Sequence, residues 1–220
     1  MSNTHGLVVF DCDGVLVDSE RLVVDVDVAA VRSVGWDITR DEVIELFVGK
    51  SEADMKSAVE QRVGRTLGAD WDDAWRSEYR RVLDADLQAV PGVVEAVEQI
   101  QAAGWATCVA SSGDHAKMRR TLGKTGLWDT FDGRIYSALE VERGKPAPDL
   151  FLHAAGSLGF VPRCCVVVED SQYGVAGARA AGMHVVGYAG GITPASQLSQ
   201  ANVVISDMAQ LPAEVARLLG

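Results

Sequence analysis

The sequence of 220 residues has no apolar run of membrane-spanning length and no excess of positive charge. A spanning helix needs about 20 consecutive apolar residues. The net charge is −11, so the composition does not indicate a basic surface that would bind nucleic acids or anionic membranes. We therefore expect neither nucleic-acid nor membrane partners. The N-terminus also lacks a signal-peptide pattern, which favours a cytoplasmic location.

Cysteine and aromatic residues are few. The four cysteines, Cys12, Cys108, Cys164 and Cys165, lie in or beside apolar runs, and none is spaced with histidine as a metal ligand. We interpret them as reduced, mostly buried thiols of a cytosolic protein. Hydrophobic residues make up 48% and charged residues 23% of the chain, which is typical of a globular protein. The length allows one large domain, or a core with a small insert.

Apolar runs alternate with helical patterns over most of the chain. Strands are predicted at residues 7–10, 106–110, 134–137, 164–168, 183–188 and 202–205. Helices are predicted at residues 93–104, 114–124, 147–159 and 208–219, with another that ends near residue 181. Strands that alternate with helices are typical of a parallel, doubly wound sheet. The sequence therefore predicts an α/β fold, Rossmann-like, with a mainly parallel sheet.

Residues 16–88 interrupt this alternation. They are rich in Glu, Asp, Arg, Ala and Val, and helices are predicted at residues 41–48, 52–63 and 71–87. Residues 23–28 alternate like a strand but also fit one helical face, and the neighbouring helices favour the helix. We therefore predict a small all-helical cap at residues 16–88, inserted into a core formed by residues 1–15 and 89–220.

Two aspartates follow the first predicted strand. Asp11 and Asp13 lie just past its carboxyl end, where open α/β sheets bind ligands. Residues i and i+2 of an extended segment share a face, and two carboxylates there repel unless a cation or a shared proton lies between them. The pair suits Mg²⁺, or a division of work between a nucleophile and an acid/base. Alone, an Asp/Gly turn would explain the pattern better.

Three later loops, each after a predicted strand, contain residue types that phosphate chemistry needs. Ser111 and Ser112 precede a helix, whose first N–H groups form a typical anion site. Lys145 is the single cation of a loop that contains two prolines. Glu169 and Asp170 follow the most apolar strand, where charge is costly unless a cation pairs with it. A helix cap or a surface lysine explains each loop alone, but a cap does not explain both acids.

Taken together and in order, the four motifs resemble those of the haloacid dehalogenase superfamily of phosphohydrolases, along the whole chain. The resemblance implies that Asp11 is a nucleophile that forms an aspartyl phosphate, and that Asp13 is the general acid and base. It implies that Lys145 acts in catalysis and binds phosphate together with Ser111, Ser112 and Gly14. It also implies bound Mg²⁺. The implied metal ligands are Asp11, Asp13 through its backbone carbonyl, Asp170, and Glu169 directly or through water.

The cap sequence is similar to that of small sugar-phosphate phosphatases, including 6-phosphogluconate phosphatases, at residues 18–20 and 47–51. This likeness implies a small phosphorylated metabolite as substrate, a sugar phosphate or a sugar-acid phosphate. Candidate substrate residues in the cap are Glu20, Gly49, Lys50 and Ser51, and a solvated Lys50 is an equally good interpretation.

Two other functions fit the same motifs. Phosphosugar mutases of the β-phosphoglucomutase type share the layout, but they carry a cap histidine just after the first motif. This chain has no histidine between His5 and His115, which counts against a mutase. A non-catalytic phosphometabolite-binding module would be marked by loss of Asp11 or Asp13, and both are present. We expect a monomer or a weak homo-oligomer.

Overall fold

The predicted strands form one parallel sheet in the structure, a computed structural model that describes residues 6–220. The order of strands in the sheet is β3-β2-β1-β4-β5-β6. All five neighbouring pairs are parallel, so the predicted Rossmann-like α/β fold is confirmed. The strands are β1 (Leu7–Phe10), β2 (Ala106–Ser111), β3 (Ile135–Ser137), β4 (Cys165–Glu169), β5 (His184–Tyr188) and β6 (Val203–Ile205).

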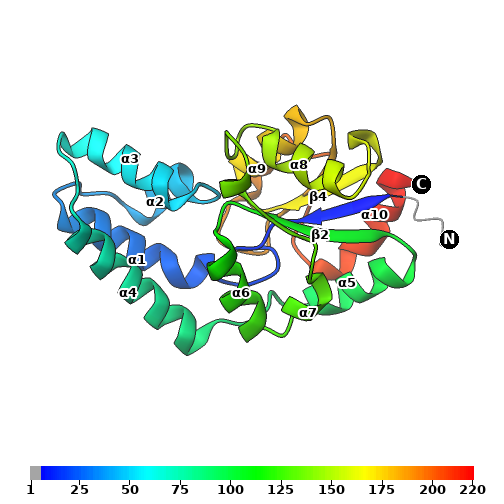
Figure 1. Ribbon diagram of the computed structural model, residues 1–220, viewed down its shortest axis with the longest axis horizontal. Coiled ribbons are helices and arrows are strands. Elements are labelled where there is room, and N and C mark those ends of the chain that lie inside the picture. The colour runs from blue at the N-terminus through cyan, green and yellow to red at the C-terminus, as the bar shows by residue number, and fades with distance from the viewer. Residues whose placement is uncertain (1–5) are drawn as a thin grey trace.

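Helices cover both faces of this sheet (Figure 1). One face packs against α5 (Val93–Ala102), α6 (His115–Lys124), α7 (Trp128–Phe131) and α10 (Leu211–Leu219), and the other packs against α8 (Asp149–Ser157) and α9 (Gln172–Ala180). Successive strand residues point to opposite faces. Val8 and Phe10 accordingly belong to the first cluster, and Leu7 and Val9 to the second. Because both faces are buried, the strand sequences are mostly apolar, as in β1 and in residues 165–168 of β4.

The central strand β1 lies between β2 and β4, so the strand order reverses there. Phe10, the last residue of β1, is paired with Val109 on one side and with Val168 on the other. In open α/β sheets, ligands bind outside the carboxyl ends of the strands at this reversal. The loops after β1, β2 and β4 therefore converge at one point of the sheet edge.

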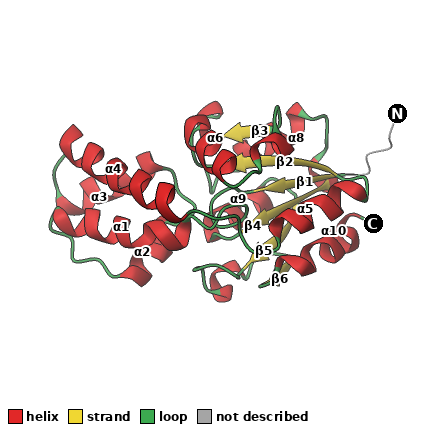
Figure 2. Cartoon of the chain, turned by 90° about the horizontal axis from the view of Figure 1, so that it is seen from below, coloured by secondary structure: helices red, strands yellow, loops and turns green. Residues whose placement is uncertain are grey.

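Four more helices lie beyond the carboxyl ends of the strands (Figure 2). They are α1 (Glu20–Ser33), α2 (Arg40–Phe47), α3 (Glu52–Val63) and α4 (Ala69–Asp86), and they share a separate cluster of buried residues. The ambiguous residues 23–28 are helical, within α1. The two chain crossings between these helices and the sheet run side by side, since Asp18 N donates to Gln88 O at 3.0 Å and Val90 N to Leu16 O at 3.1 Å. The exact division of the chain at residues 15 and 89 stays a prediction.

Differences from the predicted elements are confined to ends and short turns. Helix α8 begins at Asp149 rather than at residue 147, since Pro148 stands at its N-cap. The helix predicted from residue 114 is α6, and Asp114 is its N-cap, since its side chain accepts a hydrogen bond from Lys117 N. Helix α7 and the 3₁₀ turns at residues 138–140, 162–164 and 195–198 were not predicted, and the predicted helix at residues 208–219 begins with a 3₁₀ turn before α10. Each of these elements has three or four residues, which is too short for a helical pattern of apolar residues to show in the sequence. Within residues 6–220, no helix combines the length and apolarity of a membrane span.

The first prediction concerns the core beneath β1. Phe131 is fully buried, and its ring lies 5.9 Å from that of Phe10. We expect Phe131→Ala to lower the free energy of unfolding by about 3–5 kcal/mol, because it leaves a cavity in a packed core. Urea unfolding followed by circular dichroism measures this loss. Leu139→Ala is the control, since Leu139 is 76% exposed. Similar losses for both variants would contradict the described packing.

Candidate active site

A buried lysine joins two carboxylates where the strands converge. The side chain of Lys145 is 1% exposed, and its Nζ donates to Asp11 Oδ1 and, at 2.5 Å, to Glu169 Oε1. Burial lowers the pKa of Lys145, but the two carboxylates raise it more, so the ammonium stays charged. Burial raises the pKa of Asp11, and the Lys145 charge opposes that rise. The structure therefore brings together the predicted residues of the first, third and fourth motifs.

Glu169 is held on both of its oxygens. Oε1 accepts from Lys145, and Oε2 accepts from the backbone N and the Oγ of Ser171, both at 2.9 Å. A side chain at Gly174 would collide with this carboxylate, since an added Cβ would lie 1.8 Å from Oε1. Glycine at the start of α9 thus allows Glu169 to lie against the helix.

Asp170 is the carboxylate without a full set of partners. Its Oδ2 is buried and accepts no hydrogen bond within residues 6–220. Gly14 lies directly beneath it, with a φ of +76° that favours glycine and with an added Cβ only 1.9 Å from Oδ2. Burial, with the charge of Glu169, raises the pKa of Asp170 well above its usual range. A buried acceptor without a donor is costly unless a cation binds it.

Asp11, Glu169 and Asp170 form a group that fits a metal ion. One oxygen from each lies within 4.8 Å of the others, and all three residues are buried. Hard cations such as Mg²⁺ prefer carboxylate oxygens, and a cation would compensate the orphaned oxygen of Asp170. The donor set and its burial are consistent with a divalent cation. The side chain of Asp13 lies outside this group.

Asp13 instead faces two hydrogen-bond donors. Ser19 Oγ donates to its Oδ1 at 2.7 Å, and Lys117 Nζ donates to its Oδ2 at 2.8 Å. Burial raises the pKa of Asp13, but the charges of Lys117 and Lys145 and the hydrogen bonds from Lys117 and Ser19 together hold that pKa below its usual value. Lys117 also lies over the ring of Tyr79 in α4, 5.1 Å from the centroid. Sequence analysis missed Lys117, although its place three residues after the helix cap Asp114 puts it in the first turn of α6.

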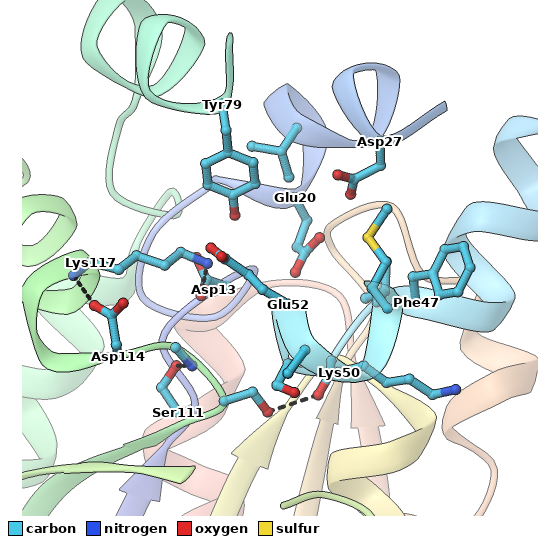
Figure 3. Close-up of a pocket in the computed structure, with 18 of the residues that line it drawn as sticks. Asp13, Glu20, Asp27, Phe47, Lys50, Glu52, Tyr79, Ser111, Asp114 and Lys117 are labelled. Atoms are coloured by element: carbon cyan, nitrogen blue, oxygen red, sulfur yellow. Dashed lines mark hydrogen bonds and ion pairs between the residues drawn. The ribbon is translucent and has the colours of Figure 1, made fainter. Parts of the chain in front are cut away.

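A cavity of about 250 Å³ lies between the sheet edge and α1–α4, and Asp11, Asp13, Tyr79 and Lys117 are among the residues that line it (Figure 3). The predicted residues Asp11, Asp13, Ser111 and Ser112 line it from the sheet side. The predicted cap residues Glu20, Gly49, Lys50 and Ser51 also line it. Further lining residues were not predicted, because no motif marks them in the sequence: Asp27, Glu52, Trp75, Arg76, Tyr79 and Lys117.

Three of the predicted residues make contacts with other residues of the protein: Gly14, Ser51 and Lys50. The amide of Gly14 donates to Val17 O at 2.8 Å, and Gly14 does not line the cavity. Ser51 caps α3, accepting from Asp54 N and donating to Asp54 Oδ2. Lys50 Nζ lies 4.6 Å from the centre of the Tyr173 ring, directed away from the middle of the cavity (Figure 3). Their roles toward a substrate stay predictions.

Backbone carbonyls of the helical region accept hydrogen bonds from the sheet side. Ser112 Oγ donates to Gly49 O at 2.9 Å, and Gln172 Nε2 donates to Glu45 O at 2.7 Å. Tyr173 Oη donates to the carbonyls of Glu45 and Leu46 at 3.2 and 3.4 Å. These contacts hold the last turn of α2 and the loop that follows it over the strand ends, so that the cavity is closed on this side.

Comparison with known proteins agrees with this geometry. Residues 5–182 match the model of the haloacid dehalogenase-like hydrolases, and the chain belongs to this family. It is 32% identical to the 6-phosphogluconate phosphatase of Escherichia coli K12, over 81% of this chain and 80% of that protein. It is 27% identical to hexitol phosphatase B of Escherichia coli O157:H7, over 94% of each chain.

The solved structures include a close match over the full length. A haloacid dehalogenase-like protein from Agrobacterium tumefaciens is 35% identical and superposes with a TM-score of 0.82, covering 98% of this chain and 99% of that one. The family and the fold predicted from the four motifs are therefore confirmed.

The second prediction tests the buried lysine. Lys145→Met should lower the free energy of unfolding by about 3–5 kcal/mol in chelator, since it leaves buried carboxylates without their cation. Urea unfolding at neutral pH measures the change. The matched control is Lys50→Met, which removes a partly exposed ammonium lying over Tyr173 and should cost about 1 kcal/mol or less. Equal costs would mean that the Lys145 network does not stabilise the fold.

Proposed function

We propose that this protein is a Mg²⁺-dependent phosphatase of small phosphorylated metabolites, sugar phosphates or sugar-acid phosphates. The observation that carries the proposal is the buried Lys145 between Asp11 and Glu169, beside the unpartnered oxygen of Asp170, with Asp11 lining a cavity. Phosphoryl transfer needs positioned positive charge around a nucleophile and an enclosed place for the ester. Relatives named as phosphatases of 6-phosphogluconate and hexitol phosphates support the same class.

In this proposal Asp11 is the nucleophile. Its carboxylate attacks phosphorus and forms an aspartyl phosphate, which divides one difficult displacement into two easier ones. Lys145 donates to Asp11 Oδ1 and thereby orients the other oxygen toward the ester. The hydroxyl of Ser111 and the backbone N–H of Ser112, at the end of β2, bind phosphate oxygens.

Asp13 is the proposed general acid and base. It takes a proton from the water that hydrolyses the aspartyl phosphate and gives that proton to the leaving-group oxygen of the next turnover, so the protons balance over the cycle. Its lowered pKa makes the protonated form a strong acid for the second of these transfers. Ser19 and Lys117 each donate to one of its oxygens, which fixes the orientation of the carboxyl group. Lys117 also places a positive charge at the cavity wall, close to where the leaving oxygen develops negative charge.

Mg²⁺ would be held by Asp11 and Asp170, with the backbone carbonyl of Asp13 and with Glu169 as a direct or water-mediated partner. When bound, the ion supplies positive charge that lets a carboxylate approach an anionic phosphate. Glu169 already receives three hydrogen bonds, whereas Asp170 Oδ2 receives none within the described residues. This contrast favours Asp170 as the ligand that depends most on the metal.

The alternative of a phosphosugar mutase has less support. A mutase must retain its product and return it for a second transfer, and the cap histidine of the β-phosphoglucomutases stands just after the first motif. Among the histidines in residues 6–220, none lines the cavity. We therefore favour hydrolysis, and analysis of the products from a hexose 1-phosphate separates free phosphate from an isomer.

The third prediction concerns the nucleophile. Asp11→Asn should lower kcat by more than about a thousandfold while the fold is kept, because the amide has the same shape but cannot attack phosphorus. Released phosphate from p-nitrophenyl phosphate with Mg²⁺ gives the rate, and thermal unfolding checks the fold. Asp129→Asn, an exposed residue on α7, is the matched control. Activity of Asp11→Asn near that of the control would refute the proposal.

The fourth prediction concerns the metal. Chelator should abolish phosphate release, and added Mg²⁺ should restore it. Asp170→Asn should weaken Mg²⁺ binding by about 10-fold to 100-fold, because the orphaned carboxylate oxygen is the ligand that is lost. Calorimetric titration of the protein with Mg²⁺ measures the affinity without reference to activity. Unchanged affinity in Asp170→Asn, with Asp129→Asn as control, would place the metal elsewhere.

A further inference from the structure

The part of the cavity formed by the helical region is acidic. Glu20 and Asp27 lie seven residues apart on α1, so they share one face of that helix, and Glu52 is the first residue of α3. All three line the cavity, and Figure 3 shows their side chains around the same space. If the phosphate of a substrate lies at Asp11, as the proposed function requires, the rest of the substrate would lie near these three carboxyl groups.

Two of these carboxyl groups have free acceptor capacity. Within residues 6–220, Glu20 receives no hydrogen bond, and Asp27 receives one, from Trp75 Nε1 to its Oδ1 at 2.8 Å. The second oxygen of Asp27 and both oxygens of Glu20 therefore have no protein donor. Carboxylate groups in a partly enclosed cavity need hydrogen-bond donors. A ligand with hydroxyl or ammonium groups supplies them, and a ligand with a carboxylate or a second phosphate does not.

The positive charges of the cavity wall are already engaged. Lys117 is paired with Asp13 at 2.8 Å, and Arg76 is paired with Glu52 at 3.2 Å. Lys50 lies over the Tyr173 ring and is directed away from the middle of the cavity. An anionic group at the far end of the substrate would have to compete with these partners for a cation.

The pKa values of two carboxyl groups in the cavity also argue against a second negative charge on the substrate. Burial raises the pKa of Asp27 to about 7, and the charge of Glu52 adds to this rise. Burial also raises the pKa of Glu20, with Asp13 and Asp27 adding to it. Negative charge is thus already unfavourable in this space without a substrate. Another negative charge nearby would add to that cost.

We propose that the helical region selects phosphate monoesters whose far end carries hydroxyl or ammonium donors and no second negative charge. The inference rests on the phosphatase function proposed above and narrows its substrate class. It separates this chain from its 6-phosphogluconate phosphatase relative, whose named substrate carries a carboxylate. The selecting residues are Glu20, Asp27 and Glu52, none of which takes part in the proposed phosphoryl transfer.

The experiment compares two esters that differ at one carbon. Glucitol 6-phosphate ends in a hydroxymethyl group where 6-phosphogluconate ends in a carboxylate. With purified protein and Mg²⁺, kcat/KM for glucitol 6-phosphate should exceed that for 6-phosphogluconate by about tenfold or more, since like charges in a binding site cost at least that factor. Equal values, or a preference for 6-phosphogluconate, would overturn the inference.

Variants test whether the acidic residues cause the preference. Glu52→Gln removes one negative charge and frees Arg76, so the ratio of the two kcat/KM values should fall about fivefold or more. Asp27→Asn keeps the acceptor for Trp75 and should lower the ratio in the same direction. Glu98→Gln, on the exposed face of α5, is the matched control and should leave the ratio unchanged. A ratio that neither Glu52→Gln nor Asp27→Asn alters would overturn the inference.

Activity on p-nitrophenyl phosphate distinguishes this test from that of the proposed function. Absence of Mg²⁺-dependent phosphate release from all three esters would refute the phosphatase itself. Release from p-nitrophenyl phosphate and 6-phosphogluconate, with loss of the latter in Arg76→Gln, would leave the phosphatase intact and show that Arg76 recruits an anionic substrate. That result would refute selection by the acidic wall.

Discussion

The structure depends on positive charge that compensates the carboxylates buried at the middle of the sheet edge. Asp11, Glu169 and Asp170 are all nearly inaccessible to solvent, and one lysine supplies the positive charge among them. Such a group is stable only where its partners are held rigidly, because a buried charge that loses its partner is costly. The reversal of strand order at β1 places Asp11 beside the acids that follow β4, and Lys145 reaches both from the segment between β3 and α8. The same compensation leaves one oxygen of Asp170 for a cation, so stability and chemistry share one set of residues.

The residues around Asp13 come from different elements than those around Lys145. Asp13, Lys117 and Tyr79 come from the loop after β1, from α6 and from α4, so the proposed acid/base is positioned by both the sheet side and the helical side. The substrate cavity lies between these two parts, and its helical wall combines acids with Trp75 and Phe47. Transfer of the phosphoryl group would use the residues at the strand ends. Discrimination between esters would use the helical wall, which does not touch the reacting atoms.

Much of this arrangement could be predicted from the sequence, because the strands are mostly apolar and are followed by acids, serines and a lysine. Asp11, Ser111, Lys145 and the acids after β4 could be predicted together, since parallel strands end at one edge of a sheet. Lys117 could not, because a lysine in the first turn of a helix usually faces solvent. Asp27, Glu52 and Tyr79 were missed for a related reason: their approach to the cavity depends on how α1, α3 and α4 pack, and a helical pattern does not encode that packing. Lys50 was chosen for its charge and its Gly49 turn, and its ammonium instead lies over Tyr173.

The hydrogen bonds that hold the end of α2 and the loop after it have a consequence for how the sequence of this protein can change during evolution. Their donors are the side chains of Ser112, Gln172 and Tyr173, and their acceptors are backbone carbonyls of residues 45, 46 and 49. A carbonyl is present whatever side chain the residue carries, so these hydrogen bonds do not require particular side chains at residues 45 and 46. Gly49 is the exception, because its φ is +85° and an added Cβ would lie 2.2 Å from Ser171 Oγ. Mutations at the other acceptor positions can therefore accumulate without loss of these hydrogen bonds. Lineages that diverge from this chain are free to vary the wall that meets the substrate while the residues at the strand ends stay in place.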